Sequence, residues 1–316
     1  MNKNIWINGV MGVIAGDALG CPVQFLSRDE LRNRGLVKGM EGHGTYDMPE
    51  GTWTDDGSMT LALLASIKEK KKIDLDDIML RFVDWVRKGE YTPFGQAFDI
   101  GNTCYDAIKM YERSGSVWTC GRDSEYSNGN GSLMRIIPAC LYTYAKQLNT
   151  DQAIKIVHEV SGLTHNHIRS HIGCGLYYFC ICSILDNEGS LAKRLQKGMY
   201  DGFAYYEAKE TYREELSHYD RLKSLIRLSG IPEDEIKSSG YIVDSLEAAV
   251  WSLLITDSFE DALLIAVNLA DDSDTVGAIA GGLAGLYYGY DGIPKEWLDV
   301  IKRREWIEEL CQVGNL

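Results

Sequence analysis

The chain has 316 residues, a formal net charge of −14 at pH 7 and a sequence pI near 4.9. Surfaces that bind nucleic acid or anionic membranes need clustered Lys and Arg, so this charge argues against both, and an anionic ligand would need metal ions. Because no low-complexity linker divides the chain, we predict a single domain over residues 1–316.

The eight cysteines include no CxxC pair, and Cys140, Cys174, Cys180 and Cys182 lie in apolar stretches, where we expect buried thiols. We find neither a secretory signal nor a run of 18 uncharged apolar residues. We therefore expect a cytoplasmic protein with reduced cysteines and no membrane partner.

Apolar residues recur at helical spacing along most of the chain, whereas alternating strand patterns are almost absent, so the predicted fold class is all-α. The polar, charged stretch 186–239 is predicted to be a variable surface excursion with helical patches. Residues 34–51, 91–103 and 127–132 are predicted to be loops because Gly, Pro or Asn-Gly pairs interrupt them. The predicted helices are 6–19, 58–67, 75–88, 135–144, 150–161, 171–185, 240–255, 259–269 and a last one that ends before Gly289.

The last predicted helix follows an acidic motif that contains Asp272, Asp274 and Thr275. Two carboxylates two residues apart, with a hydroxyl placed to cap the helix, offer the oxygen ligands that Mg2+ and Mn2+ prefer. An alternative is that the acids only occupy the positive first-turn field of the helix. Glycine costs roughly 1 kcal/mol in a helix interior, so Gly277 and Gly281 indicate a close approach to a neighbouring helix.

A second motif of this kind, Thr54-Asp55-Asp56, precedes another apolar helix. If the two motifs meet, four carboxylates and two hydroxyls can surround two cations and leave positions for water and substrate. Without cations, four such buried acids would repel one another by several kcal/mol, so either they lie apart or metal holds them together.

Two loops and a group of histidines are further candidates. The loop 91–103 carries one acid, Asp99, and the Asn-Gly pairs of 127–132 either expose N–H groups to a ligand or form an ordinary turn. His165, His167 and His171 suggest zinc, but no fourth compact ligand lies nearby in the sequence, so we do not favour this interpretation.

Several motifs in a fixed order resemble those of the ADP-ribosylglycohydrolase family, and within it the bacterial branch that removes ADP-ribose from arginine in dinitrogenase reductase. They cover most of the chain: GDALGCPVQF at 16–25, GTWTDDGSM at 51–59, FDIGNT at 98–103, NGNGSLMR at 128–135, LTH at 163–165, GYIVDSLEAAVW at 240–251 and DSDTVGAIAGGLAG at 272–285.

This resemblance implies an orthogonal multi-helix fold, a dinuclear Mg2+ or Mn2+ centre and hydrolysis of ADP-ribose from a modified protein, most of all from arginine, or from a small molecule. It implies Asp99 as the proton-transfer acid, with Asp56 and Gln24 also in the catalytic centre. The implied metal ligands are Thr54, Asp55, Asp56, Asp272, Asp274 and Thr275, with Asp274 shared. The implied substrate-binding residues are Asn130, Gly131, Ser132, Met134, His165 and Tyr241.

The sequence departs from the family at Gln24, where many members carry a glutamate close to the second metal. An amide can bind a metal through its oxygen or orient a water, but it cannot accept a proton. Two other functions therefore stay open: a catalytically weak ADP-ribose-binding protein, and a binuclear phosphohydrolase built on the same carboxylates.

Overall fold

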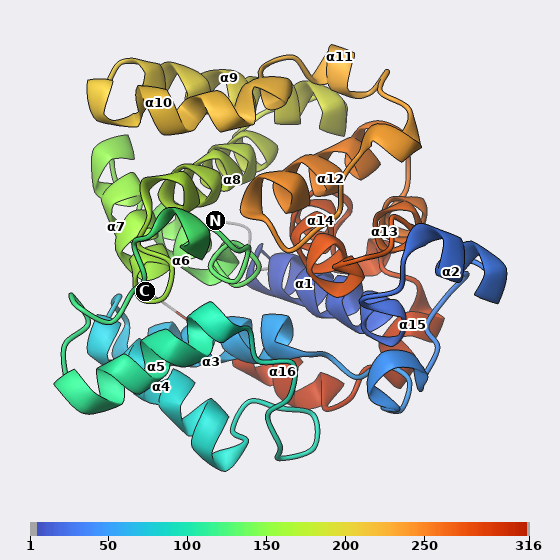
Figure 1. The fold of residues 1–316 in the computed structure, drawn as a ribbon, viewed down its shortest axis with the longest axis horizontal. Helices are drawn as coiled ribbons and strands as arrows, with labels where there is room; N and C mark the ends of the chain where they lie inside the picture. The colour runs from blue at the N-terminus through green and yellow to red at the C-terminus, as the bar shows by residue number, and fades with distance from the viewer. Residues whose placement is uncertain (1–4, 315–316) are drawn as a thin grey trace.

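The computed structural model describes residues 5–314 and confirms the predicted all-α class, because this part of the chain forms helices and no strand. Figure 1 shows α1 and α14 in the interior, with helices on all sides of them. The α-helices are α1 (Ile5–Gly20), α2 (Arg28–Arg34), α3 (Asp55–Lys70), α4 (Leu75–Lys88), α5 (Asn102–Ser114), α6 (Ile137–Ala145), α7 (Thr150–Gly162), α8 (Ile168–Asp186), α9 (Leu191–Glu207), α10 (Arg213–Leu216), α11 (Leu225–Leu228), α12 (Ile242–Leu254), α13 (Phe259–Asn268), α14 (Ser273–Tyr288), α15 (Lys295–Val300) and α16 (Arg304–Leu310).

The packing of α1 against α14 is the most extensive helix contact in the structure. Glycines make it possible: a Cβ atom on Gly12 would lie 2.1 Å from the carbonyl oxygen of Gly281, and one on Gly16 would lie 2.0 Å from that of Gly277. Real side chains do not tolerate such distances, so only glycine permits this approach. The close helix contact predicted from Gly277 and Gly281 is thereby confirmed, and its partner is α1.

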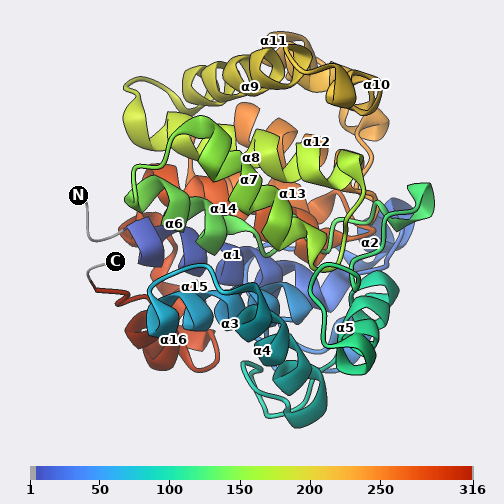
Figure 2. The same ribbon diagram turned by 90° about the vertical axis from the view of Figure 1, so that its left-hand side faces the viewer.

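Further helices enclose this central pair in layers. Figure 2 shows α9, α10 and α11 on one outer side, above α8 and α12, with α3, α4 and α16 on the opposite side of α1. The stretches Ile5–Val23 and Ile168–Asp186 are long and apolar enough to cross a membrane, but 94% and 78% of their apolar 18-residue windows are buried within the protein. They are therefore placed as core helices.

The predicted surface excursion 186–239 forms part of the outer layer. It contains α9, α10 and α11, and its side chains Leu195, Met199 and Tyr206 are fully buried. The eight cysteines are free thiols, and all except the half-buried Cys182 are buried, so the prediction of burial was wrong for Cys182.

Candidate active site

The two acidic motifs meet in space at the starts of α3 and α14. Thr54 is the N-cap of α3, and its hydroxyl lies 3.3 Å from Oδ2 of Asp274. Reciprocally, the hydroxyl of Thr275 lies 3.4 Å from Oδ1 of Asp56. Each motif thus places a hydroxyl against a carboxylate of the other. The prediction that Thr275 caps α14 was wrong, because the N-cap is Asp272, three residues earlier.

Burial of these acids is nearly complete and their charges are not compensated. Asp56 and Asp274 are fully buried, and each has one carboxylate oxygen without a hydrogen-bond partner among the described residues. Burial, together with repulsion from neighbouring acids, raises the pKa of Asp55, Asp56 and Asp274 well above the ordinary value. Unpaired buried carboxylate oxygens are the donor set that a hard cation requires, so the site fits a divalent metal.

Asp17 is a site residue that the sequence analysis did not identify. This fully buried carboxylate of α1 accepts hydrogen bonds from the backbone N–H of Thr54, at 2.9 Å, and of Gly57, at 2.7 Å. Asp17, Asp56 and Asp274 form a triad whose carboxylate oxygens lie within 4.8 Å of one another and could hold a metal ion. Burial raises the pKa of Asp17 to about 7 despite the two N–H donors. The sequence does hold a signal for this residue, because Asp17 is the only charged residue of the apolar helix α1.

Above the acids lies a cleft of about 400 Å³, which Asp55, Asp272 and Thr275 line together with Asp99. Asp99 precedes α5, and its backbone is left-handed, with φ of 56°. The Tyr46 hydroxyl donates a hydrogen bond to Oδ1 of Asp99, while Oδ2 has no partner among residues 5–314. The carboxylate is therefore oriented through one oxygen, while its other oxygen is buried and unpaired. Tyr46 lies in the predicted loop 34–51 and was not among the predicted site residues.

Four of the six predicted substrate-binding residues line this cleft, namely Asn130, Gly131, Met134 and His165. The side chain of Asn130 donates a hydrogen bond to Oδ2 of Asp272 at 2.6 Å, which links the loop 127–132 to the acids.

The other two predicted substrate-binding side chains lie elsewhere. The hydroxyl of Ser132 is buried against Ser161 and Cys174, away from the cleft lining. The half-exposed ring of Tyr241 lies against the guanidinium of Arg169, 5.8 Å from the ring centroid, and is not among the residues that line the cleft. Neither of these two side chains is therefore placed to contact a ligand in the cleft.

Gln24 lies at the edge of the acids, as its position in the motif implied. Its amide nitrogen donates a hydrogen bond of 3.4 Å to Oδ1 of Asp272, and its buried Oε1 has no partner in the described part of the chain. The amide nitrogen thus bonds to an acid of the site, while the amide oxygen has no partner among the described residues. Gln24 can serve as a neutral ligand, but it carries no proton-accepting carboxylate.

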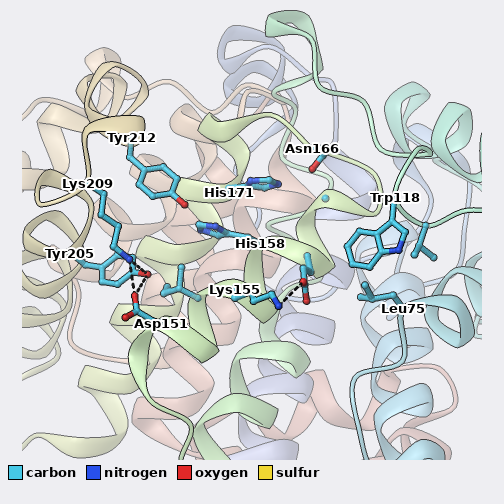
Figure 3. A pocket seen from close by; sticks show the side chains of 14 residues that line it. Leu75, Trp118, Asp151, Lys155, His158, Asn166, His171, Tyr205, Lys209 and Tyr212 are labelled. Atoms are coloured by element: carbon cyan, nitrogen blue, oxygen red, sulfur yellow. Dashed lines mark hydrogen bonds and ion pairs between the residues drawn. The ribbon is translucent and has the colours of Figure 1, made fainter.

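The histidines considered for zinc diverge in the structure. His165 lines the cleft, His167 caps α8, and His171 stacks on His158 with ring centroids 4.9 Å apart. Figure 3 shows the latter pair in a second pocket, which side chains of α7 line and where Lys209 and Asp151 form an ion pair of 2.7 Å. The three histidines therefore cannot share one zinc ion.

The fold and site define the class of the protein: an all-α chain with a buried carboxylate and hydroxyl cluster suited to divalent metal, at the base of a ligand-sized cleft. A model of the ADP-ribosylglycohydrolase family matches residues 6–316, and the chain belongs to this family. The resemblance drawn from the motifs is thereby confirmed.

Relatives agree with this assignment over nearly the whole chain. It is 34% identical over 303 residues to ADP-ribosylarginine hydrolase Tri1 of Serratia proteamaculans, which covers 96% of this chain and 76% of that protein. It is 30% identical over 311 residues to the ADP-ribosyl-(dinitrogen reductase) glycohydrolase of Rhodospirillum rubrum, with 98% and 94% covered. A solved structure of an ADP-ribosylglycohydrolase-related protein complex aligns with a TM-score of 0.77 at 27% identity, covering 98% of this chain and 96% of that one.

Proposed function

We propose that this protein hydrolyses the N-glycosidic bond between ADP-ribose and a modified arginine, with two Mg2+ or Mn2+ ions at the carboxylate cluster. The observation that carries the proposal is the meeting of Thr54-Asp55-Asp56 with Asp272, Asp274 and Thr275, where buried carboxylate oxygens have no hydrogen-bond partner among the described residues. The names of the relatives, which include an ADP-ribosylarginine hydrolase, support arginine as the acceptor.

The residues that would hold the ions are the six acids and hydroxyls of the two motifs, with Gln24 as a neutral ligand through Oε1. Divalent ions there would supply Lewis-acid chemistry, which stabilises the negative charge that develops on oxygen in the transition state. Asp17 does not need to contact an ion to contribute, because its hydrogen bonds to the N–H of Thr54 and Gly57 fix the start of α3.

The reaction breaks the bond between the anomeric carbon and a guanidine nitrogen and forms a carbon–oxygen bond to water. One proton of that water must reach the leaving nitrogen. Asp99 is the carrier we assign, because it lines the cleft, the Tyr46 hydroxyl fixes its Oδ1, and its buried Oδ2 has no hydrogen-bond partner among the described residues. A carboxylate held in this way can accept the proton and pass it to the leaving group.

The test is to incubate the full-length protein with arginine-, serine- and DNA-linked mono-ADP-ribose, with Mn2+ or with EDTA, and to quantify free ADP-ribose by chromatography. We expect release from arginine only with metal, while helical circular dichroism in EDTA stays close to that of the metal-loaded protein, because the core does not depend on the ions. Release of AMP or phosphate in place of ADP-ribose would instead support a binuclear phosphohydrolase.

A second candidate function, ADP-ribose binding with weak turnover, is favoured by one observation: Gln24 replaces a carboxylate and donates to Asp272. The variant Gln24→Glu separates the two functions. In a hydrolase whose amide serves as a neutral ligand, turnover should stay within about threefold. In a binding protein that lacks its base, turnover should rise by about 100-fold or more.

A further inference from the structure

Arg135 is a fully buried cation in a place where packing alone does not require one. Its guanidinium lies 4.9 Å from the centroid of the Phe82 ring and makes no salt bridge with a carboxylate within residues 5–314. Its hydrogen bonds go to the carbonyl oxygen of Val160, at 3.4 Å, and to the hydroxyl of Thr164, at 2.6 Å. A buried charge without a counter-charge is costly, so its position calls for a role.

The contact with Thr164 determines where the protons lie on the next residue, His165. A guanidinium can only donate, so the Thr164 oxygen accepts from Arg135. Thr164 is fully buried, and its own hydroxyl proton needs an acceptor, which Nδ1 of His165 provides at 2.8 Å. The nearby Cys104 sulfur is a much weaker acceptor. Nδ1 is therefore unprotonated, and the ring proton resides on Nε2.

The remaining edge of the His165 ring faces the ligand cleft. A Cβ on Gly131 would lie 2.9 Å from Cε1 of this ring, and one on Gly129 would lie 3.5 Å from Nε2. The loop glycines thus leave room for the imidazole to reach the cleft, which His165 lines. Burial, with the charge of Arg135 as a second cause, lowers the pKa of His165 to about 3, so the ring is neutral at physiological pH.

We infer that Arg135 and Thr164 are positioning residues that hold His165 as a neutral Nε2–H donor to a phosphate oxygen of ADP-ribose. The inference deepens the proposed function and rests on it for the identity of the ligand. An anionic oxygen is the acceptor that fits this Nε2–H group. The Arg135 guanidinium lies behind the imidazole, and no carboxylate of the described chain pairs with it. The acids gather instead at the helix starts, where Asn130 of the loop bonds to Asp272.

The first measurement is the tautomer of His165 in the ligand-free, full-length protein. Nitrogen-15 spectra of histidine-labelled protein distinguish protonated from unprotonated ring nitrogens, and His165→Gln assigns the signal. We expect an unprotonated Nδ1 and a protonated Nε2 from pH 5 to pH 8. A proton on Nδ1, or titration of the ring within this range, would overturn the inference. Because this uses the wild-type chain, it does not depend on any variant folding.

The second measurement separates positioning from general stability. Thr164→Val removes the hydroxyl at nearly constant shape and should populate both tautomers and raise the Kd for ADP-ribose about tenfold, while the Kd for adenosine, which has no phosphate, stays the same. Thr164→Ser should restore both values. Thr143→Val is the matched control, because Thr143 is equally buried and bonds only to the carbonyl of Cys140, at 2.8 Å.

The part played by Arg135 is tested by Arg135→Met, since replacing a buried charge by an apolar side chain is often tolerated. Without the guanidinium, the Thr164 hydroxyl can either donate to Nδ1 or accept from it, so that both tautomers of His165 should be populated and part of the protein should carry a proton on Nδ1. An unchanged tautomer in this variant would overturn the positioning role of Arg135 and Thr164. Equal losses of ADP-ribose and adenosine binding in Thr164→Val would overturn it as well. If the wild-type protein failed to bind ADP-ribose, the proposed function would be rejected. The tautomer of His165 would still show whether Arg135 and Thr164 position the ring.

Discussion

The buried acids make the stability of the metal-free protein depend on pH in an unusual direction. An acid whose pKa is higher in the folded state than in the unfolded chain keeps its proton longer in the folded state, so the free energy of unfolding falls as pH rises between the two pKa values. For Asp17 the window runs from about 4 to about 7. Since a tenfold change in proton affinity corresponds to about 1.4 kcal/mol, Asp17 alone accounts for up to about 4 kcal/mol.

The pKa values of Asp55, Asp56 and Asp274 are also raised well above the ordinary value, which adds to the loss of stability as pH rises. We therefore expect the Tm of EDTA-treated protein, followed by circular dichroism, to fall by about 5 to 10 °C between pH 4.5 and pH 7.5. Mn2+ at 100 times its Kd should add about 2.7 kcal/mol at pH 7.5 and much less at pH 4.5, because binding requires deprotonated carboxylates.

Two variants control this experiment. Asp56→Asn removes one buried charge, so the metal-free profile should become flatter and the effect of Mn2+ smaller. Asp29→Asn changes an acid whose side chain is 92% exposed and should reproduce the wild-type profile. A metal-free Tm that rises over this pH range, or a gain from Mn2+ that is equal at both ends, would refute the reasoning.

Three further predictions concern single contacts. Asp274→Asn should raise the Kd for Mn2+, measured by calorimetry, to a value at least tenfold higher than Asp272→Asn does. The reason is that Asp274 also contacts the other motif, through Thr54. Equal effects of the two variants would argue against a shared ligand. Tyr46→Phe removes the hydroxyl that orients the proposed acid and should lower kcat about tenfold with KM within twofold, so unchanged kcat would remove that role. Gly16→Ala places a Cβ 2.0 Å from a backbone oxygen of α14 and should cost about 3 kcal/mol in urea unfolding, whereas Gly101→Ala, with no atom within 4 Å, should cost far less.

Long, apolar helices could be predicted from the sequence to within a few residues. The predicted helix 150–161 is α7 (Thr150–Gly162), and 259–269 is α13 (Phe259–Asn268). The short helices α2 and α16 were not predicted, because seven residues give too little periodicity to distinguish a helix from a turn. The start of α14 was misjudged by three residues, since several oxygen-bearing residues in succession could each have been its cap.

Predicting the site had a different limit. The acids of the two motifs could be recognised because hydroxyl and carboxylate groups repeat at two helix starts. Asp17, Tyr46 and Arg135 could not be assigned in the same way, because their roles depend on partners elsewhere in the chain. Thr54 lies 37 residues from Asp17, and Asp99 lies 53 residues from Tyr46. No local spacing rule predicts such contacts.

The glycines of α1 connect the fold to the chemistry. A Cβ on Gly20 would lie 2.4 Å from the backbone nitrogen of Asp274, so the end of α1 contacts the first turn of α14 at the metal-binding acids themselves. Any side chain there would move Asp274 relative to Asp17 and widen the triad. The close approach therefore sets the separation of the carboxylates. The helix packing that stabilises the core also holds the acids at a distance where, without a cation, they repel one another.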